Sequence, residues 1–239
     1  MGFADIHIHL LYGADDGART EEQMQQMLDA AYADGTRAIC ATPHCHPGYY
    51  GENGGAVSAA FERLRAYAVR YPDLELTLGS ELRYSPGCLD WLRNGTCRTL
   101  NDTRRLLVDF ADDDAPDEII TALQKLLNSG YSPVLAHAER YRRLRSDLRE
   151  LYMLRDWGVL IQVDTQSLLG EWDRSSKKRS HRILAAHLCD IIATDAHDTG
   201  SRPPVMSACY QLIARKYGAD YAGRVCERTP LAVLHDYER

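Results

Sequence analysis

Two histidines, His7 and His9, close the apolar stretch at the start of the chain, and Asp16 follows soon after them. In a β-strand, residues i and i+2 point to the same face of the sheet. Two imidazoles spaced in this way project side by side and form half of a site for a divalent metal ion. The chain therefore opens with residues whose chemistry is metal binding.

Further residues of metal-ligating type follow apolar stretches along the rest of the chain. They are His44, Glu81, Asp109, His137, Asp195 and His197. A single His-x-His pair is a weak signal, because two ordinary strand histidines would give the same pattern. A set in which each member closes an apolar stretch favours a metal cluster. Mixed imidazole and carboxylate ligands suit Mn, Fe or Zn better than Ca or Mg.

The stretches that carry these residues read as strands that alternate with helices. Apolar stretches predict strands at 3–8, 37–41, 75–78, 105–110, 133–136, 159–163 and 190–194. Helical spacing, together with caps and Gly or Pro stops, predicts helices at 21–34, 57–71, 86–93, 117–129, 142–157, 175–188, 203–217 and 220–228. Strand–helix alternation with short connections indicates a parallel sheet. About seven repeats in a chain of this length favour a closed or nearly closed barrel over a doubly wound sheet.

This architecture tells where the ligand-type residues lie. The carboxyl ends of parallel strands gather at one edge of a sheet or barrel, and active sites form there. The residues above lie at or just after the ends of six predicted strands, so we expect them to converge. The longest predicted loop, residues 44–55 with Pro47, Tyr49 and Tyr50, suits a rim over such a site.

Composition sets the class of protein. The chain has 239 residues, of which 45% are hydrophobic and 26% charged, which is typical of a globular protein. One domain of this length, spanning residues 1–239, buries a core without a structural metal, so a bound metal is predicted to be catalytic. The net charge of −6 disfavours a nucleic-acid partner. The one short basic run, Lys177 to Arg179 near Arg174, is predicted to be a solvated helix start.

The cysteines and the first residues of the chain bear on the cellular compartment of the protein. Seven cysteines are present without a Cys-x-x-Cys pair, which excludes a zinc ribbon or a thioredoxin-type motif. Scattered free thiols indicate a reducing cytoplasm. The first strand leaves no room for a signal peptide, and no apolar run approaches the ~18 residues of a membrane span. We therefore expect a cytoplasmic protein that does not insert into a membrane.

Seven short motifs occur in order along nearly the whole chain. They are Asp5-Ile-His-Ile-His9, Asp15-Asp-Gly17, Ala41-Thr-Pro-His44, Gly79-Ser-Glu81, Ala136-His-Ala-Glu-Arg-Tyr141, Thr194-Asp-Ala-His197 and Ser201-Arg-Pro-Pro204. In this ordered set the chain resembles the PHP (polymerase and histidinol phosphatase) superfamily of metallophosphoesterases. It is most similar to the bacterial tyrosine-protein phosphatases linked to capsule and exopolysaccharide synthesis. The resemblance implies an α/β fold, a distorted (β/α)7 TIM-like barrel of the PHP type.

The resemblance also implies a centre of up to three metal ions, with Mn the most expected and Fe or Zn as alternatives. By position, the first site would hold His7, His9 and Asp195, the second Glu81 (bridging), Asp109 and His137, and the third Asp16, His44 and His197. Two metal ions ~3.5–4 Å apart share a hydroxide, which would be the nucleophile that attacks the phosphate.

Two arginines and a protein partner follow from the same resemblance. Arg140 and Arg202 would hold the phosphate, since a guanidinium group binds phosphate oxygens in a bidentate manner. The substrate would be a phosphotyrosine-bearing protein. The resemblance points to the Tyr-rich tail of an autophosphorylating bacterial tyrosine kinase that controls polysaccharide synthesis.

The chain departs from the family pattern at several positions. Asp109 stands where a Glu is usual, His137 is followed by Ala rather than Pro, and Asp164 replaces an Asn. Leu10-Leu-Tyr-Gly13 replaces the more common Ile-Leu-Pro-Gly. The predicted ligands are retained, so these departures bear chiefly on substrate preference and on the second metal site.

Other functions compete with this one. A small-molecule phosphomonoesterase of the histidinol-phosphatase type would use the same metal chemistry. A nuclease or polymerase accessory fits the fold but not the acidic charge, and the shortened Asp109 favours a metal-bound scaffold without turnover. Cys209 and Arg215 match the Cys-x5-Arg spacing of cysteine-dependent phosphatases. That chemistry needs a Gly-rich loop, whereas the intervening residues are typical of a helix interior, so it is excluded.

Several residues stay open at this stage. Asp15 is the alternative to Asp16 as a ligand, His46 either joins the site or lies near its entrance, and Glu139 either orients a neighbour or caps a helix. The aromatic residues that could stack on a substrate ring, or simply pack within loops, are Tyr49, Tyr50 and Tyr84. The histidines expected to be structural or exposed are His181, His187 and His235.

Overall fold

The computed structural model describes residues 2–46, 48–50, 54–144 and 147–235. Its first half contains β1 (Phe3–Ile8), α1 (Glu21–Asp34), β2 (Thr36–Ala41), β3 (His44–Cys45), α2 (Gly54–Ala68), β4 (Glu75–Leu78), β5 (Glu81–Arg83) and α3 (Cys88–Arg93). Its second half contains β6 (Arg105–Asp109), α4 (Pro116–Asn128), β7 (Ser132–Leu135), α5 (Arg149–Asp156), β8 (Leu160–Asp164), α6 (Thr165–Leu169), α7 (Arg174–Ala185), β9 (Ile191–Ala193), α8 (Ser207–Tyr217), α9 (Ala219–Gly223) and α10 (Thr229–Leu234). Short helical turns lie at Leu100–Asp102 and Arg224–Arg228.

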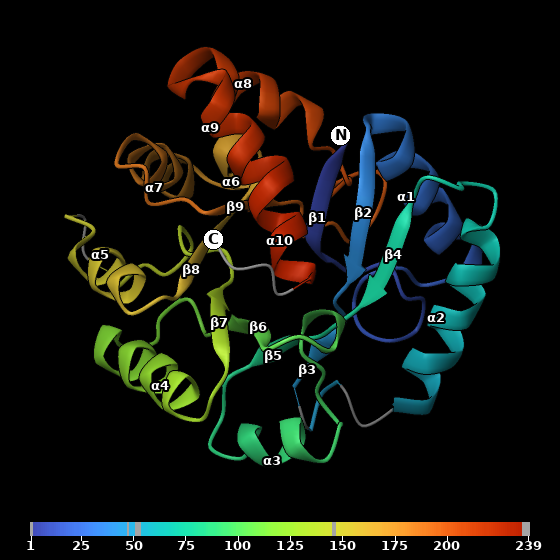
Figure 1. The fold of residues 1–239 in the computed structure, drawn as a ribbon, viewed down its shortest axis with the longest axis horizontal. Coiled ribbons are helices and arrows are strands. Elements are labelled where there is room, and N and C mark those ends of the chain that lie inside the picture. Colours follow the sequence, from blue (N-terminus) through green and yellow to red (C-terminus); the bar gives the residue numbers. More distant parts are fainter. Residues whose placement is uncertain (1, 47, 51–53, 145–146, 236–239) are drawn as a thin grey trace.

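The strands form a curled parallel sheet with helices outside it (Figure 1). One sheet has the order β1-β2-β4 and the other β3-β5-β6-β7-β8-β9, and every paired strand is parallel. The two sheets are joined on both sides. Next to β9, Asp195 N donates to His7 O (2.8 Å) and links the end of the larger sheet to β1. On the other side the chain itself links the sheets, because β3 follows β2 and β5 follows β4 after two residues each. The fold is therefore mixed α/β with parallel strands, as the alternation of the sequence predicts.

The predicted count of seven strand–helix units is not confirmed, because the described residues form nine strand segments. Two residues separate each of the additional segments, β3 and β5, from the end of β2 and β4 respectively. Pro43, which lacks a backbone N–H, stands in the first break, and Gly79 stands in the second. Both short segments begin with polar residues, His44 and Glu81, so no apolar stretch announces them in the sequence.

Helix α1 illustrates how local sequence sets the elements. The Thr20 side chain accepts a hydrogen bond from Gln23 N (3.2 Å) and caps the helix. Gly35 ends it with φ of 109°, a left-handed conformation that favours glycine. The buried face repeats at Met24, Met27, Leu28 and Ala31, which is the spacing of an amphipathic helix.

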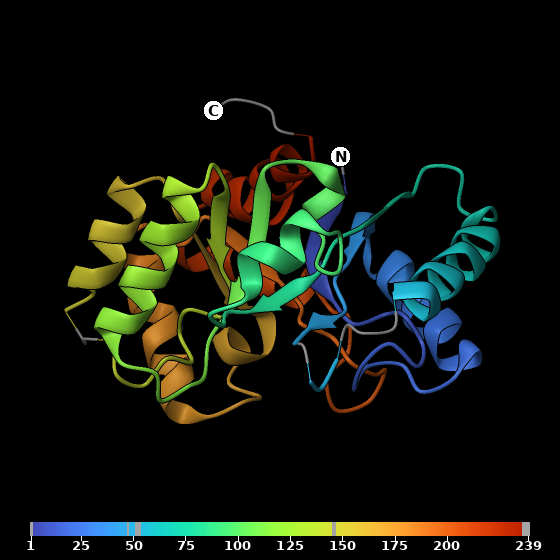
Figure 2. The ribbon, with the colours of Figure 1, turned by 90° about the horizontal axis from the view of Figure 1, so that it is seen from below.

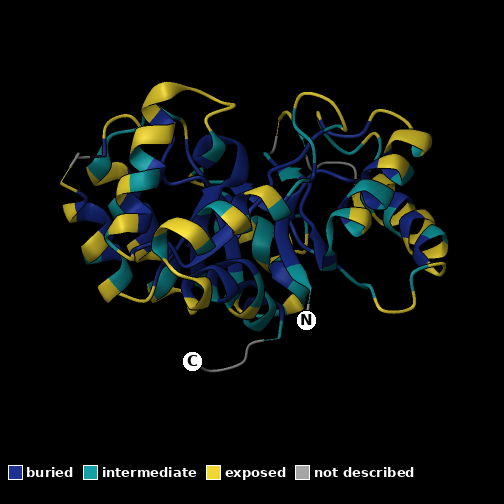
Figure 3. Ribbon diagram, turned by 90° about the horizontal axis from the view of Figure 1, so that it is seen from above, coloured by how far each residue is buried: buried dark blue, intermediate teal, exposed yellow. Residues whose placement is uncertain are grey.

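The core lies on both sides of the strands. Figure 3 shows the strands buried and the outer helix faces exposed. Inside the curled sheet, Ile6, Leu107 and Val134 pack in one cluster with Val233 and Leu234 of α10. Helix α10, which the sequence pattern did not indicate, thus supplies apolar side chains to the same core as the strands. Burying each such side chain contributes about 1.5–3 kcal/mol.

Some predicted boundaries are wrong. The helix predicted at 142–157 begins at Arg149, and residues 145–146 of that range lie outside the described residues. The helix predicted at 203–217 begins at Ser207, because Pro203 and Pro204 disfavour helix at the preceding positions. Asp34 of α1 accepts hydrogen bonds from Met206 N and Ser207 N and so caps α8 from a distance. Of the predicted loop at 44–55, Pro47 and residues 51–53 lie outside the described residues.

The connections that follow β1, α6 and β9 lie along one edge of the molecule, the lower edge in Figure 2. This is the edge toward which the carboxyl ends of the strands point. Within the part of the chain that the structure describes, no helix combines the length and the apolarity needed to cross a membrane.

The core makes a prediction about stability. Leu126 is fully buried on α4, whereas Gln124 on the same helix is exposed. Leu126→Ala should lower the free energy of unfolding by about 2–5 kcal/mol, because it removes buried methyl groups and leaves a cavity. Gln124→Ala should change it by less than about 0.5 kcal/mol. Urea unfolding of both variants would measure this, and equal stabilities would contradict the packing described for α4.

Candidate metal centre

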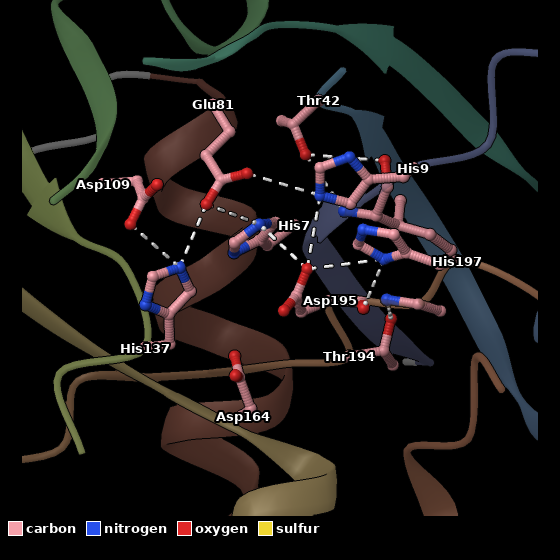
Figure 4. Close-up of polar contacts among 12 residues, drawn as sticks. His7, His9, Thr42, Glu81, Asp109, His137, Asp164, Thr194, Asp195 and His197 are labelled. Carbon is pink, nitrogen blue, oxygen red and sulfur yellow. Dashed lines mark hydrogen bonds and ion pairs between the residues drawn. The ribbon is translucent and has the colours of Figure 1, made fainter. Parts of the chain in front are cut away.

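The side chains predicted as metal ligands lie together at the carboxyl-end edge of the strands. Figure 4 shows seven of them: His7, His9, Glu81, Asp109, His137, Asp195 and His197. His7 belongs to β1, His9 follows it, and His44 and Glu81 begin β3 and β5. The remaining ligand candidates end or follow strands β6, β7 and β9, or lie in the loop after β1. Their nitrogen and carboxylate atoms form three groups, each with all atoms within 4.8 Å of one another: His9, Asp16, His44 and His197; His7, His9 and Asp195; and Glu81, Asp109 and His137.

Glu81 lies at the centre of these groups. Its carboxylate oxygens lie 3.3 Å from His7 Nε2, 3.4 Å from His9 Nε2, 2.7 Å from His44 Nδ1 and 3.0 Å from His137 Nε2. Glu81 is 1% exposed, so these contacts lie away from bulk water. A single carboxylate that reaches an imidazole of every group has the position of a bridging ligand.

Asp195 joins the first two histidines from the other side. Its Oδ1 atom lies 3.3 Å from His7 Nε2 and 3.2 Å from His9 Nε2. Both Nε2 atoms are buried, and neither forms a hydrogen bond of good geometry among the described residues, although carboxylate oxygens lie 3.2–3.4 Å from them. A buried polar atom without a partner costs about 1–3 kcal/mol. A divalent cation coordinated by these nitrogens and carboxylates would remove that cost, so the donor set fits a metal ion.

A second layer of side chains orients the histidines. Asp15 Oδ2 lies 2.7 Å from His9 Nδ1 and accepts a hydrogen bond from His44 N (2.9 Å). Gln162 Oε1 lies 3.0 Å from His7 Nδ1. Partners of this kind fix the ring orientation of metal-binding histidines. The structure thus groups Asp16 with the candidate ligands and places Asp15 behind His9.

Two candidate ligands have a strained backbone. His137 has φ of 31° and Asp195 has φ of 50°, in a region that residues other than glycine rarely adopt. Hydrogen bonds hold both in place: His137 N donates to Gln162 Oε1 (3.1 Å) and Asp195 N donates to His7 O (2.8 Å). Such conformations cost about 1–3 kcal/mol each and cluster at functional sites.

The electrostatics of the cluster favour bound cations. Burial is the largest influence on His44 and opposes its charge, but the Glu81 and Asp16 carboxylates together outweigh burial and raise the pKa of His44 to about 10. Burial likewise opposes charge on His137, yet Asp109 helps to raise the pKa of His137 to about 9. Burial is the main cause that raises the pKa of Asp109 to about 6. Without metal, protons on the imidazoles therefore compensate the clustered carboxylates.

Two arginines meet at the same carboxylate. Arg140 Nη2 donates to Asp195 Oδ2 (2.7 Å), and Arg202 Nη2 donates to the same oxygen (2.5 Å). Arg140 Nη2 also lies 2.5 Å from Asp164 Oδ2, so the residue that replaces the usual Asn pairs with a predicted phosphate ligand. Arg179, in the run interpreted as a solvated helix start, donates to the backbone carbonyls of Glu139 and Arg140.

A cavity of about 170 Å³ opens beside these groups. Its lining includes His44, Glu81, His137, Arg140 and Arg202. A larger cavity of about 380 Å³ lies between α2 and β4 and contains none of the candidate ligands. The donor atoms therefore identify the site better than cavity size does.

Arg83 is a third arginine at the cavity, and the sequence did not point to it. Its Nε lies 2.9 Å from Asp109 Oδ2. Tyr141, fully buried, places its hydroxyl 3.5 Å from Asp109 Oδ1. These contacts fix the shortened Asp109 side chain against β5.

The structure shows the contacts of the residues whose roles the sequence left open. His46 belongs to none of the donor groups and stacks on Tyr49 (4.6 Å between ring centroids), while Tyr50 stacks on His44 (5.6 Å). Tyr84 stacks on Phe110. The buried Glu139 accepts a hydrogen bond from Asp164 N (3.2 Å), which fits an orienting role.

The histidines expected to be structural or exposed, and Cys209, lie in or next to helices. His181 contacts the Tyr217 hydroxyl, the His187 ring lies tilted against the Tyr221 ring, and His235 pairs with Glu75. Cys209 is fully buried in α8, and burial raises its pKa well above its usual range. A buried, protonated thiol inside a helix is not a nucleophile, so the cysteine-dependent mechanism is excluded.

Comparison with known proteins yields one family and close structural likenesses. The family described as capsular polysaccharide synthesis, CpsB/CapC, matches residues 3–235. The tyrosine-protein phosphatase CpsB of Streptococcus pneumoniae is 32% identical over 238 residues, which cover 97% of this chain and 98% of that protein. A crystal structure from a study of YwqE from Bacillus subtilis and CpsB from Streptococcus pneumoniae, described as unique metal-dependent tyrosine phosphatases, matches with a TM-score of 0.89 and 29% identity, covering 98% of this chain and 95% of that one. A phosphotriesterase homology protein from Escherichia coli has a TM-score of 0.64 at 10% identity, covering 96% and 97% of the two chains, and shows likeness of fold alone.

Removal of the second-layer carboxylate should weaken metal binding. Asp15→Ala removes the carboxylate that contacts His9 Nδ1 and accepts from His44 N, so we expect the affinity for Mn²⁺ to fall about 10–100-fold. Asp90→Ala, which removes an exposed carboxylate on α3, is the control. Calorimetric titration of the metal-free variants would measure the Mn²⁺ affinity of each. An unchanged affinity in Asp15→Ala would contradict the orienting role of Asp15.

Metal binding should also release protons. His44 and His137, with pKa values of about 10 and about 9, carry protons at neutral pH in the metal-free protein. A metal ion binds only the neutral imidazole, so these protons leave and the apparent affinity rises between about pH 6 and pH 9. Titration of Mn²⁺ in a weak buffer with a pH indicator would detect the release. An affinity independent of pH over that range would contradict the charges assigned here.

Proposed function

Because the chain belongs to the CpsB/CapC family of capsular polysaccharide synthesis, we propose that it is a metal-dependent tyrosine-protein phosphatase. The family match spans nearly the whole chain, and a relative of nearly the same length is named a tyrosine-protein phosphatase. The observation that carries the proposal is the meeting of three donor groups and two arginines around Glu81 and Asp195 beside one cavity. The reaction is hydrolysis of a phosphate monoester on tyrosine.

The three groups of donor atoms would each hold one divalent ion. His7, His9 and Asp195 would hold the first, Glu81, Asp109 and His137 the second with Glu81 as a bridge, and Asp16, His44 and His197 the third. When bound, such ions would neutralise phosphate charge and would supply a water of lowered pKa as the nucleophile. Manganese is the metal we propose, since imidazole and carboxylate ligands suit it.

The chain's own contribution is to bind and orient the phosphate. Arg140 and Arg202 are both charged and converge on Asp195 at the cavity. Each retains a buried Nε–H without a hydrogen-bond partner among the described residues. A planar guanidinium with a free donor matches phosphate oxygens, so these groups would receive the dianion of the substrate. Asp164 pairs with Arg140 and holds it in place.

The shape of the site agrees with a side chain presented by another protein. A cavity of about 170 Å³ accommodates a phosphate group and part of its ester, and leaves the rest of a macromolecular substrate outside. Tyr50 stacks on His44 beside the third donor group. The substrate we propose is a phosphotyrosine-bearing protein, specifically an autophosphorylating bacterial tyrosine kinase that controls polysaccharide synthesis. The location that follows from this partner is the cytoplasm.

The fold proposal follows the same family. If β2 with β3 and β4 with β5 are each one interrupted strand, the nine segments become a ring of seven. Gly79 N donates to Ala41 O (2.9 Å) and Glu81 N donates to Pro43 O (3.1 Å), so the pairing continues across the breaks, which supports this count. On this basis we propose a distorted (β/α)7 barrel that forms one domain over residues 1–239.

Substrate preference tests the function. With added Mn²⁺, the protein should hydrolyse a phosphotyrosine peptide faster than a phosphoserine peptide or histidinol phosphate, measured as phosphate release. Chelation should abolish the activity and added metal should restore it. A preference for histidinol phosphate would place the chain with small-molecule phosphatases, and the absence of turnover on every substrate would leave a metal-bound scaffold.

The arginine contacts make a separate prediction. Arg202→Ala removes one donor to phosphate, so kcat/KM for the phosphotyrosine peptide should fall about 10²–10³-fold while bound Mn²⁺ is unchanged. Arg140→Ala should act in the same direction. Arg93→Ala, which removes an exposed arginine of α3, is the control. Unaltered kcat/KM in both site variants would disprove the phosphate-binding role.

A further inference from the structure

Trp172 contacts both of the arginines at the site. The Arg140 guanidinium carbon lies 4.2 Å from the centre of the Trp172 ring, and that of Arg202 lies 5.5 Å from it. Both distances fall within the range of cation–π attraction. Trp172 is 44% exposed, so a large aromatic side chain stays partly in water while it touches two cations of the cavity. No sequence motif drew attention to this residue.

The connection that carries Trp172, residues 170–173 between α6 and α7, is anchored at both ends. Gln166 of α6 donates through Nε2 to Ser201 O (2.7 Å), which ties this helix to the residue before Arg202. Asp173 accepts hydrogen bonds from Ser175 N and Ser176 N and caps α7. These hydrogen bonds fix the helices before and after residues 170–173, and so they restrict where the Trp172 indole ring can lie.

The same unit also fixes the backbone of Arg140. Arg179 on α7 donates to the carbonyl oxygens of Glu139 and Arg140. Helix α7 therefore holds the Arg140 main chain, while the connection before it places an aromatic ring against the Arg140 side chain. The main chain and the side chain of Arg140 are therefore both contacted by the continuous segment formed by residues 170–173 and α7.

The arrangement of charges explains what the ring does. Arg140 and Arg202 both donate through Nη2 to Asp195 Oδ2, so two positive groups lie close together and repel each other. The negative face of an indole ring attracts both cations. Contact through the guanidinium face leaves the N–H donors in its plane free, and each arginine has a buried Nε–H without a partner among the described residues.

We propose that Trp172 is a positioning residue that holds the Arg140 and Arg202 guanidinium groups for phosphate binding. The proposal rests on the phosphatase function proposed above, because it assigns the arginines to a phosphate monoester. It concerns phosphate affinity, and it does not require the indole to touch the tyrosine ring of the substrate.

The test measures binding of inorganic phosphate to the Mn²⁺-loaded protein by calorimetry, without turnover. Trp172→Ala should weaken binding about tenfold, which corresponds to ~1.4 kcal/mol. Trp172→Phe keeps an aromatic face and should stay within about threefold of the unchanged protein. Metal content and unfolding temperature should be unaltered. Trp157→Ala is the matched control, since Trp157 is 38% exposed and follows α5, and no cation–π contact joins it to either arginine.

A double-mutant cycle shows whether the ring acts through the arginines. In the Arg202→Ala background, Trp172→Ala should cost less phosphate affinity than it costs in the unchanged protein. An equal cost in both backgrounds, or a Trp172→Ala variant that binds phosphate like Trp157→Ala, would overturn the proposal. A loss confined to phosphotyrosine peptides with unaltered phosphate affinity would also overturn it, because the indole would then contact the aryl group.

The two proposals fail in different ways. If the unchanged protein binds phosphate but hydrolyses no phosphotyrosine, the phosphatase function fails and the positioning role of Trp172 is still measured. If it hydrolyses phosphotyrosine and Trp172→Ala leaves phosphate affinity intact, the positioning role fails alone. If the Mn²⁺-loaded protein binds no phosphate, the positioning role is overturned as well.

Discussion

The buried contact of Glu81 and Asp195 with His7 and His9 is the constraint on which the site depends. The two carboxylates face the same imidazole nitrogens, and all of these groups are at most 3% exposed. Two like charges about 4 Å apart repel by about 4 kcal/mol at an effective dielectric constant of 20. Cations must therefore balance the carboxylates. In the metal-free protein the clustered carboxylates raise the pKa of His44 to about 10 and that of His137 to about 9, so these histidines take up protons. A divalent ion would balance the same carboxylates and would be coordinated by the Nε2 atoms of His7 and His9.

Much of the surrounding structure serves to hold these groups in place. Parallel strands bring their carboxyl ends to one edge, so residues distant in sequence meet. The left-handed backbone of His137 and Asp195 aims their side chains inward at a cost that hydrogen bonds from Gln162 and β1 offset. Asp15 and Gln162 then fix the rings of His9 and His7. On the far side, Asp195 also accepts hydrogen bonds from both arginines, which links the metal donors to the phosphate-binding groups.

The sequence predicted the α/β alternation and the convergence of the ligand residues, because strand ends, caps and ligand types are local features. It missed β3 and β5, since a strand that begins with His44 or Glu81 has no apolar signal. Helix α5 begins later than its spacing indicated, and α10 packs through tertiary contacts that no local pattern encodes. Gln162 could have been noticed as a polar residue within the buried strand β8. Trp172 could not, because its role depends on two arginines that only the folded chain brings beside it.

The most direct test of the account is a crystal structure of the protein grown with Mn²⁺, with anomalous diffraction used to locate the metal. The account predicts anomalous peaks within the three donor groups, one of them between His7, His9 and Asp195, and Glu81 in contact with two of the ions. Peaks elsewhere on the molecule, or a metal-loaded structure in which Glu81 and Asp195 have moved away from these histidines, would contradict it.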